Sequence, residues 1–177
     1  MTRARTLFLL MYDYTIPGYR LSLLEVQKLA YFLQAVGEPL KLRFEKSKYG
    51  PYAENLNHVL LRLDGHFIRG FVDRSRDAEI YLISDVAQKA EQYLKGDSEA
   101  HEHLGRVRDI IQGFETPYGL ELLSTVHWIV KENPDIKDDI QSIVEEVHNW
   151  NERKQKIFKE KHITKVWQHL KGIGMLN

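Results

Sequence analysis

The sequence predicts a mainly α-helical fold, in which one compact multi-helix domain carries a small antiparallel β ribbon. Two observations favour this fold class. Apolar residues recur at helical spacing along most of the 177 residues, and helix-capping residues precede several of those stretches. Residues 40–45 instead alternate apolar and charged side chains, which is typical of a half-buried strand. Because no linker, low-complexity tract or repeat divides the chain, we predict a single domain over residues 1–177.

The helical pattern divides the chain into eight segments. Helices are expected over residues 4–14, 22–36, 52–63, 85–95, 99–113, 117–132, 134–150 and 160–171. A second strand is expected over residues 79–83. Pairing of this strand with residues 40–45 would form the ribbon.

Three helix starts are marked by their capping residues. Ser22 and Glu25 have the spacing of a capping box, and the helix that follows them is apolar on most sides. A helix of that kind is expected at the centre of the domain, with neighbours on several sides. Thr116 and Asn133 each precede a proline, which predicts a cap with proline in the first helical turn.

Composition excludes several classes of protein. The chain has no cysteine, which excludes disulfides, thiolate metal sites and cysteine nucleophiles. Its formal net charge is zero, which excludes a uniformly basic nucleic-acid binder. No apolar run approaches the roughly 20 residues of a membrane span, so a cytoplasmic location and no membrane contact are expected.

No motif for catalysis is present. The sequence lacks a glycine-rich phosphate loop and a GxSxG nucleophile elbow. The close pair His101 and His103 points to opposite sides of a helix, so it does not form a metal site. His127 is either a catalytic base or a hydrogen-bonded core histidine, and the second interpretation is favoured because no triad pattern surrounds it. We therefore predict no catalytic residue, no cofactor, no metal and no enzyme activity.

Charge is distributed unevenly near the C-terminus. Residues 116–150 hold 2 basic and 7 acidic side chains, whereas residues 151–177 hold 7 basic and 2 acidic ones. The domain is therefore interpreted as a core over residues 1–132, followed over residues 133–177 by an acidic helix and a basic helical tail. The tail is expected either to contact nucleic acid or to dock by its apolar side and pair with the acidic helix.

The acidic helix offers the first set of candidate partner-binding residues. Carboxylates that recur each turn, roughly 5.4 Å apart, can imitate a row of backbone phosphates. The alternative is an ordinary solvated helix face. The residues concerned are Asp135, Asp138, Asp139, Glu145 and Glu146.

A tyrosine-rich corner offers the second set. Gly50 and Pro51 favour a rigid turn into a helix, with stiff tyrosines on either side. The corner either contacts a partner or is a structural turn, and a second Pro-Tyr sequence opens the helix at residue 117 with the same ambiguity. The candidate residues are Tyr49, Tyr52, Glu54, Asn55 and Tyr118.

Several stretches together resemble the C-terminal domain of DarG, the macrodomain antitoxin of the DarT/DarG toxin–antitoxin system. They are LLEVQKLAYFLQ at residues 23–34, FEK at 44–46 with YGPYAENL at 49–56, GHFIRG at 65–70, GFETPYGLELL at 113–123 and TVHW at 125–128. The resemblance covers about residues 5–130. A more distant resemblance is to the Panacea antitoxin domain.

The resemblance implies a function. DarT is an NAD-dependent ADP-ribosyltransferase that modifies thymine in single-stranded DNA, and the C-terminal domain of DarG binds it. We therefore expect an antitoxin domain that binds and inhibits a DarT-type toxin by occupying its DNA site, with the ten candidate residues as the contact. The family's macrodomain, which removes the modification and is normally fused to this domain, is absent from this sequence, so the resemblance implies no hydrolase activity. The alternative from the residues is a DNA-binding module that uses the basic C-terminal helix, although nucleic acid is the less expected partner.

Overall fold

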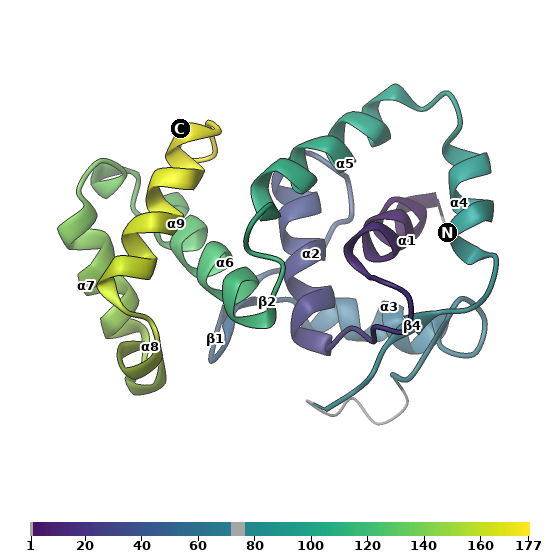
Figure 1. The fold of residues 1–177 in the computed structure, drawn as a ribbon, viewed down its shortest axis with the longest axis horizontal. Helices are drawn as coiled ribbons and strands as arrows, with labels where there is room; N and C mark the ends of the chain where they lie inside the picture. Colours follow the sequence, from purple (N-terminus) through teal and green to yellow (C-terminus); the bar gives the residue numbers. More distant parts are fainter. Residues whose placement is uncertain (1, 72–76) are drawn as a thin grey trace.

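A computed structural model describes residues 2–71 and 77–177. Within these two ranges the chain forms nine α-helices, one short 3₁₀ helix and two two-stranded antiparallel sheets (Figure 1), which confirms the predicted fold class. In chain order the elements are α1 (Thr2–Tyr14), α2 (Leu23–Ala35), β1 (Glu45–Ser47), β2 (Gly50–Tyr52), α3 (Glu54–Leu63), β3 (Ile68–Arg69), β4 (Tyr81–Leu82), α4 (Val86–Leu94), α5 (Ser98–Ile111), α6 (Pro117–Glu132), the 3₁₀ helix η1 (Pro134–Ile136), α7 (Ile140–Trp150), α8 (Glu152–Ile157) and α9 (Glu160–Gly172).

Helix α2 lies at the centre of the N-terminal part, as its apolar pattern predicts. Ten of its 13 residues are buried, and it packs on α1, α5 and α6 (Figure 1). The capping box is also confirmed. The Ser22 hydroxyl accepts from the amide of Glu25 at 3.2 Å, and the Glu25 carboxylate accepts from the amide of Ser22 at 2.9 Å.

Helix α6 joins the two halves of the chain. It lies between α2 on one side and the group α7–α9 on the other (Figure 1). Its predicted start is confirmed, because the Thr116 hydroxyl accepts from the amide of Gly119 at 2.9 Å and Pro117 occupies the first turn. Eleven of its 16 residues are buried, so the helix belongs to both packed groups.

The predicted strand over residues 40–45 is wrong. The strands that form are shorter, and each pairs with its neighbour along the chain: β1 pairs with β2, and β3 pairs with β4. The alternation of burial is real, since Leu40, Leu42 and Phe44 are half-buried and Lys41 and Arg43 are exposed. The backbone of residues 40–44 nevertheless lies outside both sheets, and only Glu45 of the predicted range belongs to β1.

Side-chain amides take the place of a neighbouring strand in this segment. The Gln34 amide binds both the backbone N–H and the carbonyl of Leu42, at 2.7 and 2.9 Å. The Asn55 amide binds the N–H of Arg43 and the carbonyl of Lys41, at 3.0 and 3.2 Å. Because these amides satisfy the backbone groups, the alternating pattern needs no strand partner.

The predicted helix over residues 134–150 is interrupted. Residues 134–136 form η1, and α7 begins only at Ile140. Asp139 is the cap of α7, whereas the Asn133 side chain donates to the carbonyl of Ile129 at the end of α6. The short helix α8 is not among the predicted elements, because its six residues are too few to show a helical period.

Candidate partner-binding surfaces

Three of the predicted contact residues line one pocket. Tyr49, Tyr52 and Tyr118 surround a cavity of about 430 Å³ together with Lys28, Glu121 and Arg153. Ser22, the cap of α2, together with Leu23, Leu24 and Gln27 of that helix and Pro117 completes its wall. We call this cavity the tyrosine pocket. It is mainly apolar, but it carries charged side chains from three different helices.

The turn between β1 and β2 is held in place from both sides. Gly50 has φ +97°, a conformation that favours glycine, and an added Cβ would come within 3.1 Å of Thr125 Oγ1. On the opposite side, the Trp150 indole donates to the carbonyl of Ser47 at 2.8 Å, and the Asn151 amide donates to that of Lys48 at 3.0 Å. These contacts fix the positions of the tyrosines on either side of the turn.

A buried carboxylate links the pocket to the C-terminal helices. Glu121 is 2% exposed. Its Oε1 accepts from Arg153 Nη1 and from Lys154 Nζ, both at 2.6 Å, and its Oε2 accepts from Arg153 Nη2 at 3.1 Å. Burial raises the pKa of the Glu121 carboxyl, but the hydrogen bonds from Arg153 and Lys154 outweigh burial and hold the pKa below its ordinary value.

Lys28 is a buried lysine beside this network. Its side chain is 1% exposed, and Nζ donates to the carbonyl of Pro51 at 2.6 Å. Burial, reinforced by the positive charge of Lys154, lowers the pKa of Lys28 to about 7, although Glu121 opposes the change. A strongly shifted lysine that lines a cavity is a feature of functional sites.

The remaining residues of the predicted corner serve the local structure. Asn57 donates to the Tyr52 hydroxyl, and its amide also lies 3.4 Å from the Glu54 carboxylate. Asn55 binds the backbone of residues 41 and 43 and does not line the pocket. The structure thus brings together the three tyrosines but not Glu54 and Asn55.

Tyr118 connects the pocket to the C-terminal tail. Its hydroxyl donates to the carbonyl of Ile157 at 3.1 Å and lies 2.8 Å from His162 Nδ1. Its ring packs edge-on against Phe158 with the centroids 5.1 Å apart. The residue is 37% exposed, so part of it remains accessible.

The predicted row of carboxylates is not continuous. Asp135 lies on η1, and Asp139 caps α7 by accepting from the amide and hydroxyl of Ser142 at 3.2 and 2.6 Å. Asp138 pairs with Lys171 at 2.8 Å. Glu145 and Glu146 are exposed on α7. We call Asp135, Asp138, Asp139, Glu145 and Glu146 the acidic surface.

Much of the basic tail is engaged within the protein. Arg153 and Lys154 bind Glu121, Lys156 pairs with Glu152 at 2.9 Å, and Lys171 pairs with Asp138. The alternative in which the tail docks by its apolar side is confirmed, but of these ion pairs only Lys171–Asp138 joins the tail to the acidic segment, because Glu121 belongs to α6 and Glu152 to α8. Ile163, Val166 and Leu170 of α9 are buried.

The histidines also have structural partners. His127 is 8% exposed, its Nδ1 lies 2.7 Å from the Tyr31 hydroxyl, and burial with the nearby charge of Lys131 lowers its pKa to about 4. It is thus a hydrogen-bonded core histidine. His103 binds Glu38 at 2.7 Å, and His101 binds the carbonyl of Asp97. Among the described residues, no group of three His, Asp or Glu side chains is arranged to hold a metal ion.

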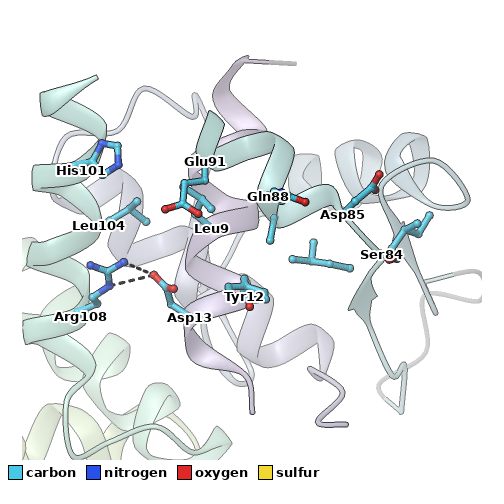
Figure 2. Close-up of a pocket in the computed structure, with 13 residues that line it drawn as sticks. Leu9, Tyr12, Asp13, Ser84, Asp85, Gln88, Glu91, His101, Leu104 and Arg108 are labelled. Carbon is cyan, nitrogen blue, oxygen red and sulfur yellow. Dashed lines mark hydrogen bonds and ion pairs between the residues drawn. The ribbon is translucent and has the colours of Figure 1, made fainter. Parts of the chain in front are cut away.

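A larger cavity of about 700 Å³ lies between α1, α4 and α5. Figure 2 shows Arg108 of α5 directed at Asp13 of α1, with Nε 3.1 Å from the carboxylate. Asp85, also in its wall, pairs with Lys89 at 2.9 Å. None of the predicted contact residues lines this cavity.

Sequence reasoning missed Lys28, Glu121 and Arg153 as members of the site. A signal for the first two is present, because each is a charged residue inside an otherwise apolar helical stretch. Charged residues are almost never fully buried unless they are paired. Such positions in a sequence therefore indicate a buried polar network.

Comparison with known proteins identifies relatives for most of this chain. No family model matches the sequence. A DNA ADP-ribosyl glycohydrolase of Thermus aquaticus is 46% identical over 155 residues, which are 87% of this chain and 42% of that protein. Proteins of the same name from Mycobacterium bovis and Mycobacterium tuberculosis are each 31% identical over 150 residues, which are 81% of this chain and 42% of theirs. Most of this chain is therefore homologous to one segment of the proteins named DNA ADP-ribosyl glycohydrolase, and that segment is less than half of their length.

Proposed function

We propose that this chain is an antitoxin domain that binds a DarT-type DNA ADP-ribosyltransferase and inhibits it by occupying the toxin's DNA site. The observation that carries this proposal is the 46% identity over 155 residues to a DNA ADP-ribosyl glycohydrolase, together with the resemblance to the C-terminal domain of DarG. The glycohydrolase chemistry of the relatives would then belong to the part of their chains that lies outside the aligned segment.

The acidic surface supports DNA mimicry with fewer residues than the sequence predicts. Asp138 is paired with Lys171, and Asp139 is used as a cap. Asp135, Glu145 and Glu146 are exposed and are the better phosphate mimics. A basic DNA site on the toxin would be attracted to such a surface, because complementary charge speeds encounter and fixes orientation.

The tyrosines would take part in a different way from the acids. Tyr49, Tyr52 and Tyr118 line a hollow. They therefore do not project as base mimics, and a toxin group would have to enter the pocket to contact all three rings. The acidic surface is the main contact in this proposal. The basic tail is not a contact, because most of its charged groups are paired within the protein.

Size-exclusion chromatography tests the proposal directly. The chain is mixed with a catalytically inactive DarT-type toxin, with and without excess thymine-containing oligonucleotide. We expect co-elution that the oligonucleotide abolishes. Co-elution that the oligonucleotide does not affect would reject the DNA site as the contact, and no co-elution at low salt would reject toxin binding.

A pair of charge reversals assigns the contact surface. Replacing Glu145 and Glu146 by lysine should weaken binding to the toxin and reduce its salt dependence. The matched control replaces Glu99 and Glu102, exposed on α5, by lysine and makes the same change in net charge. Equal effects of the two double variants would remove α7 from the proposed contact.

A further inference from the structure

The tyrosine pocket has an excess of positive charge that toxin binding does not explain. Lys28 and Arg153 line it, and Lys154 lies behind them, whereas Glu121 is the carboxylate that these cations surround. The Arg153 side chain is 31% exposed, while its guanidinium binds Glu121 and lies 4.6 Å from the centroid of the Tyr49 ring. When Lys28 is protonated, the wall holds two cations, Lys28 and Arg153, against the carboxylate of Glu121.

The start of α2 adds to this positive field. Ser22, Leu23 and Leu24 form one side of the pocket. Helix geometry leaves the amides of Leu23 and Leu24 without acceptors inside the helix, and the helix dipole favours an anion near its N-terminus. The amide of Glu25 is already bound by the Ser22 hydroxyl, so the first two amides are the ones that remain for a ligand.

The aromatic part of the pocket suits a flat ring. Tyr49 comes from the β1–β2 turn, Tyr52 from β2 and Tyr118 from α6. The Arg153 guanidinium lies over the Tyr49 ring, 4.6 Å from its centroid, whereas Tyr52 and Tyr118 come from separate elements and provide stacking faces with little loss of side-chain freedom on binding. The volume of about 430 Å³ is in the range of small-molecule sites, which measure about 300–1,000 Å³.

We propose that the tyrosine pocket binds a nucleoside phosphate, with the base against the tyrosine rings and the phosphate between Arg153, Lys28 and the start of α2. The ligand is either a free nucleotide or the phosphorylated end of a DNA strand, since both carry the same ring and anion. This inference does not depend on the proposed function, because it uses a pocket and not the acidic surface.

Titration calorimetry with adenosine 5′-monophosphate tests the binding site. Adenosine tests the ring without the charge, and inorganic phosphate tests the charge without the ring. We expect the nucleotide to bind at least tenfold more tightly than either. Saturation by inorganic phosphate at the same affinity would overturn the proposal, and so would no saturable binding of the nucleotide in the millimolar range. A 5′-phosphorylated oligodeoxyadenylate that binds more tightly than the free nucleotide would assign the ligand to a strand end; otherwise the free nucleotide is the ligand.

Variants of Tyr118 separate stacking from structural effects. Tyr118→Phe and Tyr118→Leu both remove the hydroxyl that binds Ile157 and His162, but only the leucine removes the ring. Base stacking contributes about 1–3 kcal/mol, so Tyr118→Leu should weaken nucleotide binding by roughly tenfold while Tyr118→Phe leaves it nearly unchanged. Equal losses in both variants would contradict a stacking role.

Two further variants test the charge and the location. Lys28→Met removes the cation with little change in length and should weaken binding of the nucleotide but not of adenosine. Tyr12→Leu changes an exposed tyrosine that lines the cavity of about 700 Å³ and should have no effect. If Lys28→Met does not fold, the Tyr118 pair still decides the proposal. Loss of affinity in Tyr12→Leu would place the nucleotide outside the tyrosine pocket.

Discussion

The acidic surface and the tyrosine pocket hold charged groups in opposite settings. Glu145 and Glu146 are exposed on one helix. Glu121, at 2% exposure, is bound by two cations from another helix. Water solvates the first kind of charge, so it can be exchanged at little cost to folding, whereas the second kind depends on its partners. The residues of the acidic surface can therefore change without loss of stability, whereas those of the pocket are tied to the stability of the fold.

The largest effect on stability should come from replacing Glu121, the buried carboxylate of the tyrosine pocket. Glu121→Gln leaves Lys154 buried without a compensating charge, so we expect the free energy of unfolding to fall by about 3–5 kcal/mol. Urea denaturation measures it. The matched change Glu145→Gln on the acidic surface should stay within about 0.5 kcal/mol of the parent. Similar losses for the two variants would contradict the contrast between the regions.

A second effect is that the contribution of Lys28 to the free energy of unfolding depends on pH. Its pKa is about 7 in the folded protein and about 10.4 when the chain is unfolded. Between these values the unfolded chain holds a proton that the folded protein has lost, so the contribution of Lys28 to stability rises with pH and is lost as the pH falls towards 7. The difference in unfolding free energy between the parent and Lys28→Met should rise from pH 7 to pH 10, with a slope approaching about 1.4 kcal/mol per pH unit. A constant difference would mean that the pKa of Lys28 is not lowered by folding.

A smaller effect separates a cap from a phosphate mimic. Asp139→Ala removes the acceptor for the Ser142 amide at the start of α7. We expect the thermal midpoint to fall by roughly 2–4 °C, which calorimetry measures. Asp139→Ser keeps a capping oxygen without the charge and should restore most of the loss. Failure of serine to restore stability would indicate that the charge, and not the cap, matters there.

The smallest effect is expected at the exposed pair of Asp138 and Lys171. Their atoms lie 2.8 Å apart, and both side chains are more than half exposed. Asp138→Asn should leave the urea midpoint unchanged at moderate salt, because exposed ion pairs contribute little and are screened. A clear loss that disappears at high salt would show that this pair helps to hold α9 against the segment before α7.

The success of the sequence predictions depends on the range of the interactions. The capping box of Ser22 and Glu25 and the cap at Thr116 are predictable because their partners lie three residues away. The strand predicted at residues 40–45 is wrong because Gln34 and Asn55, which satisfy its backbone, are not visible in an alternating pattern.

The candidate site is predictable in its aromatic part only. Tyr49, Tyr52 and Tyr118 follow from local turn patterns and do line one pocket. The cations that give the pocket its charge are distant in the sequence. Arg153 and Lys154 lie 32 and 33 positions after Glu121, and Lys28 belongs to α2. Single-sequence patterns contain no signal for such pairings, although a charge inside an apolar helix shows that a partner must exist.

The network at Glu121 also bears on how relatives of this protein can diverge. A relative that replaced Glu121 by a neutral residue would keep two cations beside a buried site, and one that lost Arg153 and Lys154 would keep a buried negative charge. Either change alone is unfavourable, whereas replacing all three by apolar residues is tolerable. We therefore expect these three positions to covary among the relatives of this chain, with α6 and α8 exchanged between relatives only as a matched pair.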